Sequence, residues 1–402
     1  MNKFILRIRK QYLFGVLLFC SLILTSLLLG EIVLRFALPV SYYIWTPHLE
    51  VVLKPDHDIM PGISGQSRFA INSTGFRGDE LSPSHTNRIL AIGGSTTECF
   101  YLDQSETWPY LLQKKLTENT SHNVWVGNAG ISGRTSRNHL TAMQYLPLSE
   151  MRIETIILLM GVNDLSKRLS RDKNFDPNFL SKPEAAMKLI DETFTGGNHL
   201  YPNDPFFKKT ALWRMLRKVK GVVLGKKVQG YGYLQDETGK MYVTWRKHRQ
   251  QAAEIRNELP DLSLALEEYA RNIHKMIDIA QEKSVRLIFL TQPTMWTPSL
   301  SKELDALLWM GGIGDFQKEY GKVYYSSEAL AKGMDKYNNI LLEICRERQV
   351  ECIDLSSILE KDTTVFYDDD HFNESGAEKL STVLSNYILS QGPFSRLRKI
   401  VF

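Results

Sequence analysis

The sequence predicts an α/β fold in which a parallel sheet lies between two layers of helices. Five apolar, strand-like runs at 88–93, 123–127, 153–160, 285–290 and 350–354 alternate with segments of helical periodicity. Short blocks rich in glycine and polar residues end or closely follow the first three runs. Because the carboxyl ends of parallel strands share one edge of the sheet, these blocks are expected to converge there.

The N-terminal segment predicts a membrane anchor. The first twelve residues carry basic side chains and no acidic one: Lys3, Arg7, Arg9 and Lys10. Residues 13–30 then carry no charge, and at about 1.5 Å per residue they extend roughly 27 Å, close to the thickness of a bilayer core. We therefore expect a cytoplasmic basic N-terminus at 1–12, a transmembrane anchor at 13–36, and an extracytoplasmic remainder, periplasmic in a Gram-negative cell.

A cleavable signal peptide is the alternative to this anchor. The apolar run exceeds the usual ~7–15 residues of such a peptide, and no clear small-x-small cleavage site follows it, so the anchor is favoured. A buried core helix is a weaker interpretation, because Glu31 and Arg35 appear only after the apolar run has ended.

Net charge and cysteine content indicate which classes of partner and cofactor to expect. A formal net charge of +4 over 402 residues is nearly neutral, which gives no reason to expect a nucleic-acid partner. The four cysteines form neither a CxxC pair nor a Cys/His cluster, so neither a metal nor a cofactor is predicted. Cys345 and Cys352 fall on a helix and the strand after it; two free thiols are favoured over a disulfide, which an oxidising compartment would allow.

The chain is expected to divide into a linker and approach segment at 37–87, rich in turn residues, and a domain at 88–402 that contains the sheet. Within that domain the predicted helices lie at about 106–118, 134–146, 261–283, 327–348 and 375–390. An insertion at about 165–260 interrupts the alternation, and a hairpin is predicted in it, with 231–234 and 241–245 flanking a turn at 236–239.

Basic and apolar residues are interleaved within this insertion. The basic members are Lys208, Lys209, Arg214, Arg217, Lys218, Lys220, Lys226 and Lys227, and the apolar members include Leu212, Trp213 and Leu216. A solvated helix face is favoured slightly over an amphipathic segment that contacts anionic lipid or an anionic glycan.

Ser95 is the candidate nucleophile. It follows the first strand in the block Gly93-Gly94-Ser95-Thr96 and precedes a helix, which places its hydroxyl at the edge of the sheet with backbone N–H groups beside it. A serine hydroxyl reacts only when a base removes its proton. Taken alone, this block is more typical of an ordinary turn or helix cap.

Two further blocks supply candidate oxyanion donors. Gly133, in Asn128-Ala129-Gly130-Ile131-Ser132-Gly133, offers a backbone N–H, and Asn163, in Gly161-Val162-Asn163-Asp164, offers a side-chain amide. Removing one such donor typically costs about 3–4 kcal/mol of transition-state stabilisation. Each block alone is a common turn sequence, and Asp164 is expected to hydrogen-bond within its own loop.

The last block, Asp368-Asp369-Asp370-His371, holds the candidate base. Asp368 precedes His371 by three residues, which allows its carboxylate to fold back onto imidazole Nδ1 and leaves Nε2 facing Ser95. Asp369 and Asp370 are alternative partners, but they are expected to be solvated or to cap the following helix.

These four blocks, in this order, resemble those of the SGNH/GDSL hydrolase superfamily over about 88–164 and 285–390. The resemblance implies a flavodoxin-like sheet, Ser95 as nucleophile, His371 as base and Asp368 as its partner. It also implies Gly133, Asn163 and the Ser95 N–H as oxyanion donors. The first block reads Gly-Gly-Ser-Thr where many members have Gly-Asp-Ser, a change that leaves the triad intact. Residues 72–78 resemble bacterial membrane-associated members.

The expected function is a serine ester hydrolase that forms an acyl-serine intermediate and acts on O-acetyl groups of a cell-surface or exported glycan. The alternatives are an acyltransferase or a lipid or thioester hydrolase using the same triad, and a non-catalytic glycan-binding or assembly protein. An α/β-hydrolase is not expected, because no Gly-x-Ser-x-Gly pentad is present.

Overall fold

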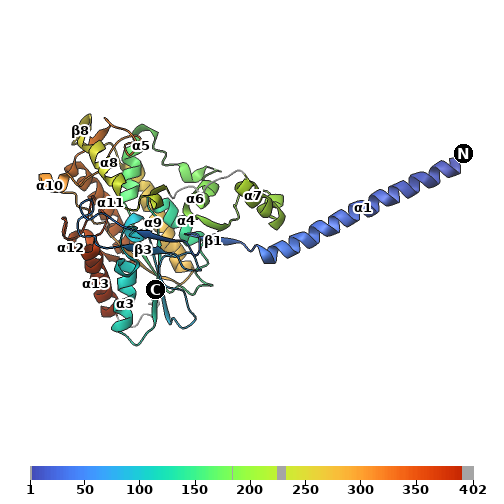
Figure 1. Ribbon diagram of the computed structural model, residues 1–402, viewed down its shortest axis with the longest axis horizontal. Helices are drawn as coiled ribbons and strands as arrows, with labels where there is room; N and C mark the ends of the chain where they lie inside the picture. The colour runs from blue at the N-terminus through green and yellow to red at the C-terminus, as the bar shows by residue number, and fades with distance from the viewer. Residues whose placement is uncertain (1, 183, 224–231, 392–402) are drawn as a thin grey trace. The chain divides into compact units, whose positions relative to one another are not determined.

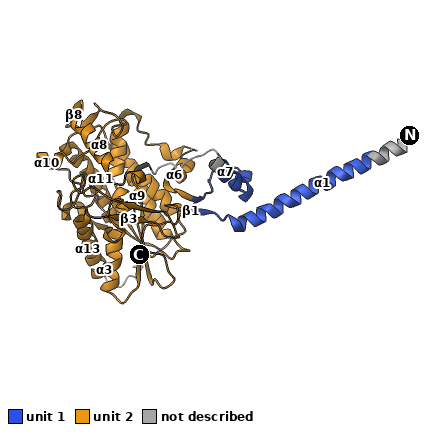
Figure 2. Ribbon diagram, viewed as in Figure 1, with its two compact units in different colours: residues 1–42, 197–229 blue, residues 43–196, 230–402 orange. Residues whose placement is uncertain are grey.

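A computed structural model describes residues 2–182, 184–223 and 232–391. The chain divides into two compact units, one of residues 1–42 and 197–229 and one of residues 43–196 and 230–402 (Figure 2). Most of the predicted linker therefore belongs to the larger unit, where Trp45, Phe69 and Phe76 are buried.

The larger unit is built on a five-stranded parallel sheet with the order β11-β9-β6-β4-β5. Its strands are β4 (Asn87–Gly93), β5 (Val124–Gly130), β6 (Thr155–Leu159), β9 (Arg286–Leu290) and β11 (Glu351–Ile353). Counted along the chain, this order is 2-1-3-4-5, that of flavodoxin-like sheets. The predicted fold class is confirmed, and each predicted strand is present to within a few residues.

Helices cover both faces of the sheet. They are α3 (Trp108–Glu118), α4 (Ser136–Tyr145), α5 (Val162–Arg171), α9 (Ser263–Glu282), α11 (Ser327–Arg348) and α13 (Glu374–Ser390). In Figure 1, α3 lies beside α13, whereas α9 packs on both α4 and α11. Right-handed crossovers place α3 and α13 on one face of the sheet and α4, α9 and α11 on the other. All residues of β5 and β6 are buried, as expected for a sheet covered on both sides.

Shorter elements complete the larger unit. The strands β2 (Glu50–Leu53) and β3 (Ser67–Ala70) pair antiparallel, and β8 (Glu254–Arg256) pairs parallel with β10 (Val323–Tyr325). The short helices are α2 (Ser95–Glu98), α6 (Ala185–Thr193), α10 (Lys302–Asp305) and α12 (Leu355–Ile358). The strands β1 (Ser41–Tyr43) and β7 (Gly196–Asn198) lie where the chain passes between the units.

The predicted hairpin in the insertion is wrong. Residues 232–235 form a 3-10 turn, and α8 (Lys240–Gln250) occupies the second predicted strand. The reason lies in Asp236, whose carboxylate accepts hydrogen bonds from the backbone N–H groups of Gly239, Lys240 and Met241 at 3.0, 3.0 and 2.7 Å. The predicted turn residues therefore start a helix. Tyr231 lies outside the described residues.

Cys345 at the end of α11 and Cys352 in β11 form a disulfide. The free thiols favoured by sequence are therefore incorrect. A helix that turns directly into a neighbouring strand brings the two Cα atoms to 6.2 Å, within the range that a disulfide spans.

The smaller unit contains α1 (Asn2–Ala37) and α7 (Ala211–Val223), with a 3-10 turn at Phe206–Lys209. The segment Arg9–Ala37 is long and apolar enough to cross a membrane, a property that an N-terminal signal sequence shares. Lys226 and Lys227, the last members of the predicted basic set, lie outside the described residues.

Candidate active site

The predicted blocks meet at one cavity of about 580 Å³ in the larger unit. Ser95, Gly133, Asn163 and His371 all line it. The first three follow β4, β5 and β6, and His371 lies in the loop before α13. The strand order reverses between β4 and β6, where open α/β sheets typically bind ligands.

Ser95 begins α2, and its turn is in close contact with Asn163. A Cβ on Gly94 would lie 2.5 Å from Asn163 Nδ2, so glycine is needed for this approach. Asn163 Nδ2 donates to the carbonyl oxygen of Arg134 at 3.1 Å. The Asn163 amide therefore lies between the serine turn and the loop that carries Gly133.

Gly133 is a glycine for a different reason. Its φ of +75° lies in the left-handed region, whereas a Cβ there would meet no atom within 4 Å. Backbone conformation, and not lack of space, disfavours a side chain at this position.

The prediction that Asp164 hydrogen-bonds within its own loop is wrong. Its carboxylate accepts hydrogen bonds from Ser136 N at 3.0 Å and Ser136 Oγ at 2.5 Å, at the start of α4. Burial raises the pKa of Asp164 to about 6. Asp164 thus ties the first turn of α5 to the start of α4, which helps to hold the two predicted oxyanion donors together.

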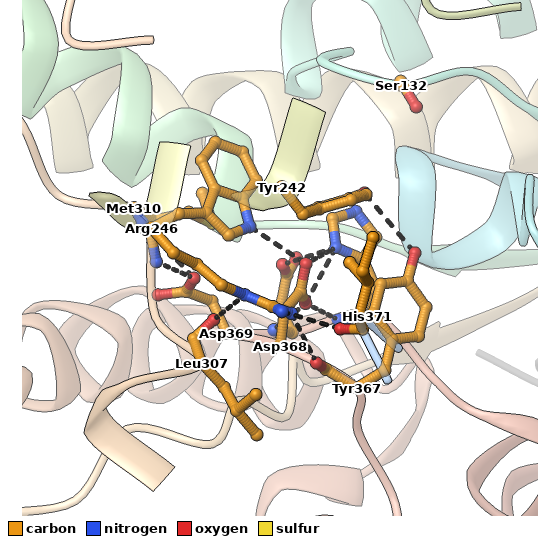
Figure 3. A network of polar contacts seen from close by, with 12 residues as sticks. Ser132, Tyr242, Arg246, Leu307, Met310, Tyr367, Asp368, Asp369 and His371 are labelled. Carbon is orange, nitrogen blue, oxygen red and sulfur yellow. Dashed lines mark hydrogen bonds and ion pairs between the residues drawn. The ribbon is translucent and has the colours of Figure 1, made fainter. Parts of the chain in front are cut away.

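His371 and Asp368 form a close pair. His371 Nδ1 lies 2.7 Å from Asp368 Oδ2 and 2.9 Å from Oδ1, and Asp368 Oδ1 accepts the His371 backbone N–H at 2.9 Å (Figure 3). Asp368 is fully buried and His371 is 8% exposed. The three-residue spacing therefore forms a turn in which the carboxylate orients the ring.

Trp309 is a partner of Asp368 that sequence reasoning missed. Its indole Nε1 donates to Asp368 Oδ2 at 2.9 Å, and its ring stacks nearly parallel to that of His371, with 6.4 Å between centroids. Tyr367 stacks on the same imidazole at 5.5 Å. Trp309 precedes the glycine pair at 311–312, which is at most a weak signal for a loop near a site.

Charges and hydrogen bonds act on the pKa of Asp368 and of His371 in opposite directions. Burial acts to raise the pKa of Asp368, but the charge of His371 and hydrogen bonds from His371 and Trp309 outweigh it and hold that pKa below its ordinary value. Burial acts to lower the pKa of His371, yet Asp368 and Asp370 raise it to about 10. The pair therefore favours a carboxylate beside a protonated imidazole.

Asp369 and Asp370 are buried, so the expectation that they are solvated or cap a helix is wrong. Asp369 accepts from Trp296 Nε1 at 2.7 Å and from Trp309 N at 2.8 Å. Burial, followed by the charge of Asp368, raises its pKa to about 6.

Asp370 lines the cavity, with Oδ1 at 3.4 Å from His371 Nδ1 and without a hydrogen-bond partner among the described residues. Burial raises its pKa to about 7. Among the described residues, ligand atoms of Asp368, Asp370 and His371 lie close enough together to hold a cation. Such an ion would have to replace the proton between His371 Nδ1 and Asp368.

The insertion forms one wall of the cavity through α8, which sequence reasoning also missed. Tyr242 and Trp245 line the cavity. Arg246 donates to the Tyr367 carbonyl at 3.0 Å and to the Leu307 carbonyl at 3.0 Å (Figure 3). The helical spacing of Tyr242, Arg246 and Arg249, all buried, was available in the sequence but was obscured by the hairpin interpretation.

Arg77, in the segment before β4, binds the carbonyl groups at the end of the serine turn and just after it. Arg77 is buried and donates to the carbonyl oxygens of Glu98, Cys99 and Leu102 at 2.7, 2.6 and 2.6 Å. Burial lowers its pKa to about 10. These bonds satisfy carbonyl groups that the short helix α2 leaves open.

Comparison with known proteins identifies relatives of this chain. The sequence model of the GDSL-like lipase/acylhydrolase family matches residues 91–379. Esterase TesA from Pseudomonas aeruginosa is 36% identical over 76 residues, which are 19% of this chain and 37% of that protein. The match thus spans little more than a third of this curated relative.

Solved structures of similar proteins are more distant. The acetylxylan esterase Axe2 from Geobacillus stearothermophilus is 13% identical with a TM-score of 0.40, over 78% of this chain and 99% of that one. A lipase/acylhydrolase from Enterococcus faecalis is 14% identical with a TM-score of 0.39, over 77% and 100%. The strand order and the family match, and not these superpositions, establish the fold.

Proposed function

This chain belongs to the GDSL-like lipase/acylhydrolase family, and we propose that it hydrolyses esters through an acyl-serine intermediate on Ser95. One observation carries this proposal: Ser95 lines the same cavity as His371, whose Nδ1 is held by the buried carboxylate of Asp368. Family membership favours this chemistry over the non-catalytic alternative.

In the proposed mechanism, His371 reacts in its unprotonated form: Ser95 Oγ attacks the ester carbonyl while Nε2 of the neutral imidazole accepts the hydroxyl proton. The negative charge on the carbonyl oxygen is stabilised by the backbone N–H groups of Ser95 and Gly133 and by Asn163 Nδ2. The tetrahedral intermediate collapses when the C–O bond to the alcohol breaks, and His371 returns the proton to the alcohol. Water then attacks the acyl-serine while His371 takes its proton, and the acid is released when the bond to Ser95 Oγ breaks and His371 passes that proton to Oγ.

Each catalytic group in this mechanism depends on a neighbour. Asp368 keeps the proton on Nδ1, so that Nε2 is the basic nitrogen, and stabilises the imidazolium that forms. Gly94 allows Asn163 to reach the serine turn. Trp309 and Tyr367 both stack on the His371 ring and hold the imidazole plane.

The proposed substrate is an O-acetyl group on a cell-surface or exported glycan. The cavity is lined by aromatic side chains, among them Tyr101, Trp245 and Phe316, together with polar groups such as Lys167 and Gln317. Flat aromatic faces beside polar groups suit a sugar ring, which has both apolar faces and hydroxyl edges. An anchor at 13–36 and the disulfide Cys345–Cys352 support a location outside the cytoplasm, where such glycans occur.

The nucleophile is tested with p-nitrophenyl acetate and the detergent-solubilised full chain. We expect Ser95→Ala to lower kcat about 10⁴-fold or more, and Ser166→Ala, a serine of the same cavity, to retain activity. A fluorophosphonate should label Ser95, as identified by mass spectrometry. Turnover that survives Ser95→Ala would exclude this nucleophile.

Asn163 is tested in the same assay. Asn163→Ala is expected to lower kcat about 10²–10³-fold, because an oxyanion donor acts mainly in the transition state, and to leave KM nearly unchanged. A change confined to KM would indicate ground-state binding instead.

The substrate class is tested with acetylated xylo-oligosaccharides and p-nitrophenyl esters of increasing chain length. If a sugar ring lies on the aromatic wall, Trp245→Ala should raise KM for the oligosaccharide and leave p-nitrophenyl acetate hydrolysis nearly unchanged. A preference for long acyl chains would favour the lipid or thioester hydrolase. Transfer of acetyl to an added glycan in place of water would favour the acyltransferase.

A further inference from the structure

The smaller unit contains a helix attached to the end of the apolar segment. The carboxylate of Glu31 in α1 accepts hydrogen bonds from the first backbone N–H groups of α7, Ala211 N at 2.9 Å and Leu212 N at 3.0 Å. Arg214 donates to the carbonyl oxygen of Leu38 at 3.1 Å. The N-terminus of α7 is therefore held where α1 ends its uncharged run.

Large apolar side chains are exposed on this part of the unit. Phe206 is 84% exposed, and Phe207, Trp213, Leu216 and Val219 are 55%, 37%, 56% and 51% exposed. Trp213, Leu216 and Val219 lie at three-residue spacing on α7 and so share one face of the helix. Phe207 packs edge-on against Trp213, with 5.5 Å between ring centroids. These five exposed residues are here called the α7 strip, and a grouping of large exposed apolar side chains of this kind usually marks a binding surface.

Basic residues lie beside the α7 strip. Lys209, Lys218 and Lys220 are exposed, and no ion pair within the described part of the chain involves Lys218 or Lys220. The arginines of α7 are used differently: Arg217 donates to the His199 carbonyl at 2.6 Å and lies over the Tyr201 ring. The arginines thus hold the unit together, as does Lys209, whose Nζ donates to the Pro202 carbonyl oxygen at 3.0 Å, whereas Lys218 and Lys220 are exposed.

We propose that the α7 strip lies in the headgroup region of an anionic bilayer, in the leaflet that α1 leaves at Gly30. Gly30 lies close to Leu212, since a Cβ there would be 3.8 Å from Leu212 Cδ2. Attachment to the end of a membrane-spanning helix would hold α7 at the lipid surface. Aromatic and aliphatic side chains insert at this depth, and lysines reach the lipid phosphates.

This proposal rests on the membrane anchor and is independent of the esterase chemistry. It replaces the solvated helix face that the sequence favoured slightly. An anionic glycan is the other class of partner considered, and the exposed aromatic and aliphatic side chains favour the bilayer, because a polyanion alone would leave them in water.

The test measures the depth of nitroxide labels on the full chain in phosphatidylglycerol/phosphatidylcholine nanodiscs. Leu216→Cys is labelled in a Cys20→Ala background, since the remaining thiol, Cys99, is buried. The matched control is Leu264→Cys on α9, because Leu264 is 54% exposed against 56% for Leu216. Native Cys20, exposed on α1, reports separately whether α1 lies in lipid.

We expect oxygen to relax the label at 216 more than a water-soluble nickel complex does, and the reverse at 264. In nanodiscs of phosphatidylcholine alone, or after Lys218→Gln with Lys220→Gln, the label at 216 should move toward water. If the label at 216 moves toward water in neither case, the role of the lysines is overturned.

A label at 216 that is as accessible to nickel as that at 264 overturns the proposal. If Cys20 is in lipid at the same time, the anchor stands and the α7 strip alone is rejected; if Cys20 is in water, both fail together. Shielding of 216 only on addition of alginate would replace the bilayer by an anionic glycan. Hydrolysis of p-nitrophenyl acetate in the same nanodiscs reports the proposed enzymatic function separately.

Discussion

The ionisable side chains of residues 368–371 are all buried within one short loop. Charges this close cannot titrate independently, because each carboxylate raises the pKa of its neighbours and of the imidazole. Asp368 holds its negative charge through His371 and Trp309, whereas burial leaves Asp370 with a pKa of about 7. The basicity of His371 therefore depends on the protonation state of Asp370.

Asp370→Asn should shift the pH dependence of catalysis. His371 acts as base only when unprotonated, so kcat/KM should rise with pH through the pKa of His371, which Asp368 and Asp370 raise to about 10. Removing one of these anions lowers that pKa, and the rising limb should move to lower pH.

The pH profile with p-nitrophenyl acetate measures this shift. Asp315→Asn is the matched control, because Asp315 lines the same cavity but is exposed and paired with Lys318 at 3.0 Å. An unchanged limb in Asp370→Asn, or one that moves to higher pH, would contradict the electrostatic role of Asp370.

Arg77→Leu should strongly destabilise the fold. The substitution leaves the carbonyl oxygens of Glu98, Cys99 and Leu102 without this donor in a buried site. We expect the free energy of unfolding to fall by about 3 kcal/mol or more. Urea unfolding of the detergent-solubilised chain measures it, with Arg68→Leu as control, because the Arg68 side chain is 56% exposed and pairs with exposed Glu50. Equal losses in the two variants would contradict this account.

At the scale of elements, the disulfide joins α11 to the edge strand β11. Closing a loop with a sequence separation of 7 stabilises a fold by about 2 kcal/mol in the chain-entropy description. Cys345→Ser with Cys352→Ser should lower the free energy of unfolding by that amount. Dithiothreitol should destabilise the native chain similarly and leave the double variant unaffected, and an equal effect of the reductant on both would show that it acts elsewhere.

The start of α8 depends on Asp236. Its carboxylate accepts hydrogen bonds from Gly239 N, Lys240 N and Met241 N, so Asp236→Ala should cost about 1 kcal/mol of unfolding free energy. Asp236→Asn, which retains a capping oxygen, should restore most of it. Since α8 carries Tyr242 and Trp245 into the cavity, a thermal scan and an oligosaccharide KM would be measured together. If Asp236→Asn loses as much unfolding free energy as Asp236→Ala, the charge of Asp236 and not its capping oxygen stabilises the start of α8.

At the scale of the molecule, two units lie on one chain that crosses between them near 42, 197 and 229. The uncleaved-anchor proposal predicts that the full chain stays in the membrane fraction after an alkaline carbonate wash and keeps its original N-terminus. N-terminal sequencing of the cell-derived protein measures this. A soluble product that begins after the apolar run would instead identify a signal peptide.

The disulfide gives an independent prediction for topology. In cells, Cys345 and Cys352 should resist alkylation until a reductant is added, because an extracytoplasmic domain is kept oxidised. Immediate alkylation in unreduced cells would place the domain in the cytoplasm.

Much of the fold could be predicted from the sequence because its signals are local. The strands β4, β5, β6, β9 and β11 are short apolar runs between turn residues, and the helices between them have clear periodicity. Parallel strands bring their carboxyl ends to one edge, so Ser95, Gly133 and Asn163 could be assigned to one site before any coordinates. The proximity of Asp368 to His371 is also local, since three residues separate them.

Tertiary structure decided what depends on distant partners. The sequence around 236–245 is compatible with a hairpin or a helix, and packing of Tyr242 and Arg246 on the loop at 367–371 accompanies the helix. Asp164 reaches Ser136, Trp309 reaches Asp368, and Asp369 and Asp370 are buried in spite of their charge. Periodicity records which face of an element is apolar, whereas the partner of a polar side chain is set by which segments the fold brings within a few ångströms.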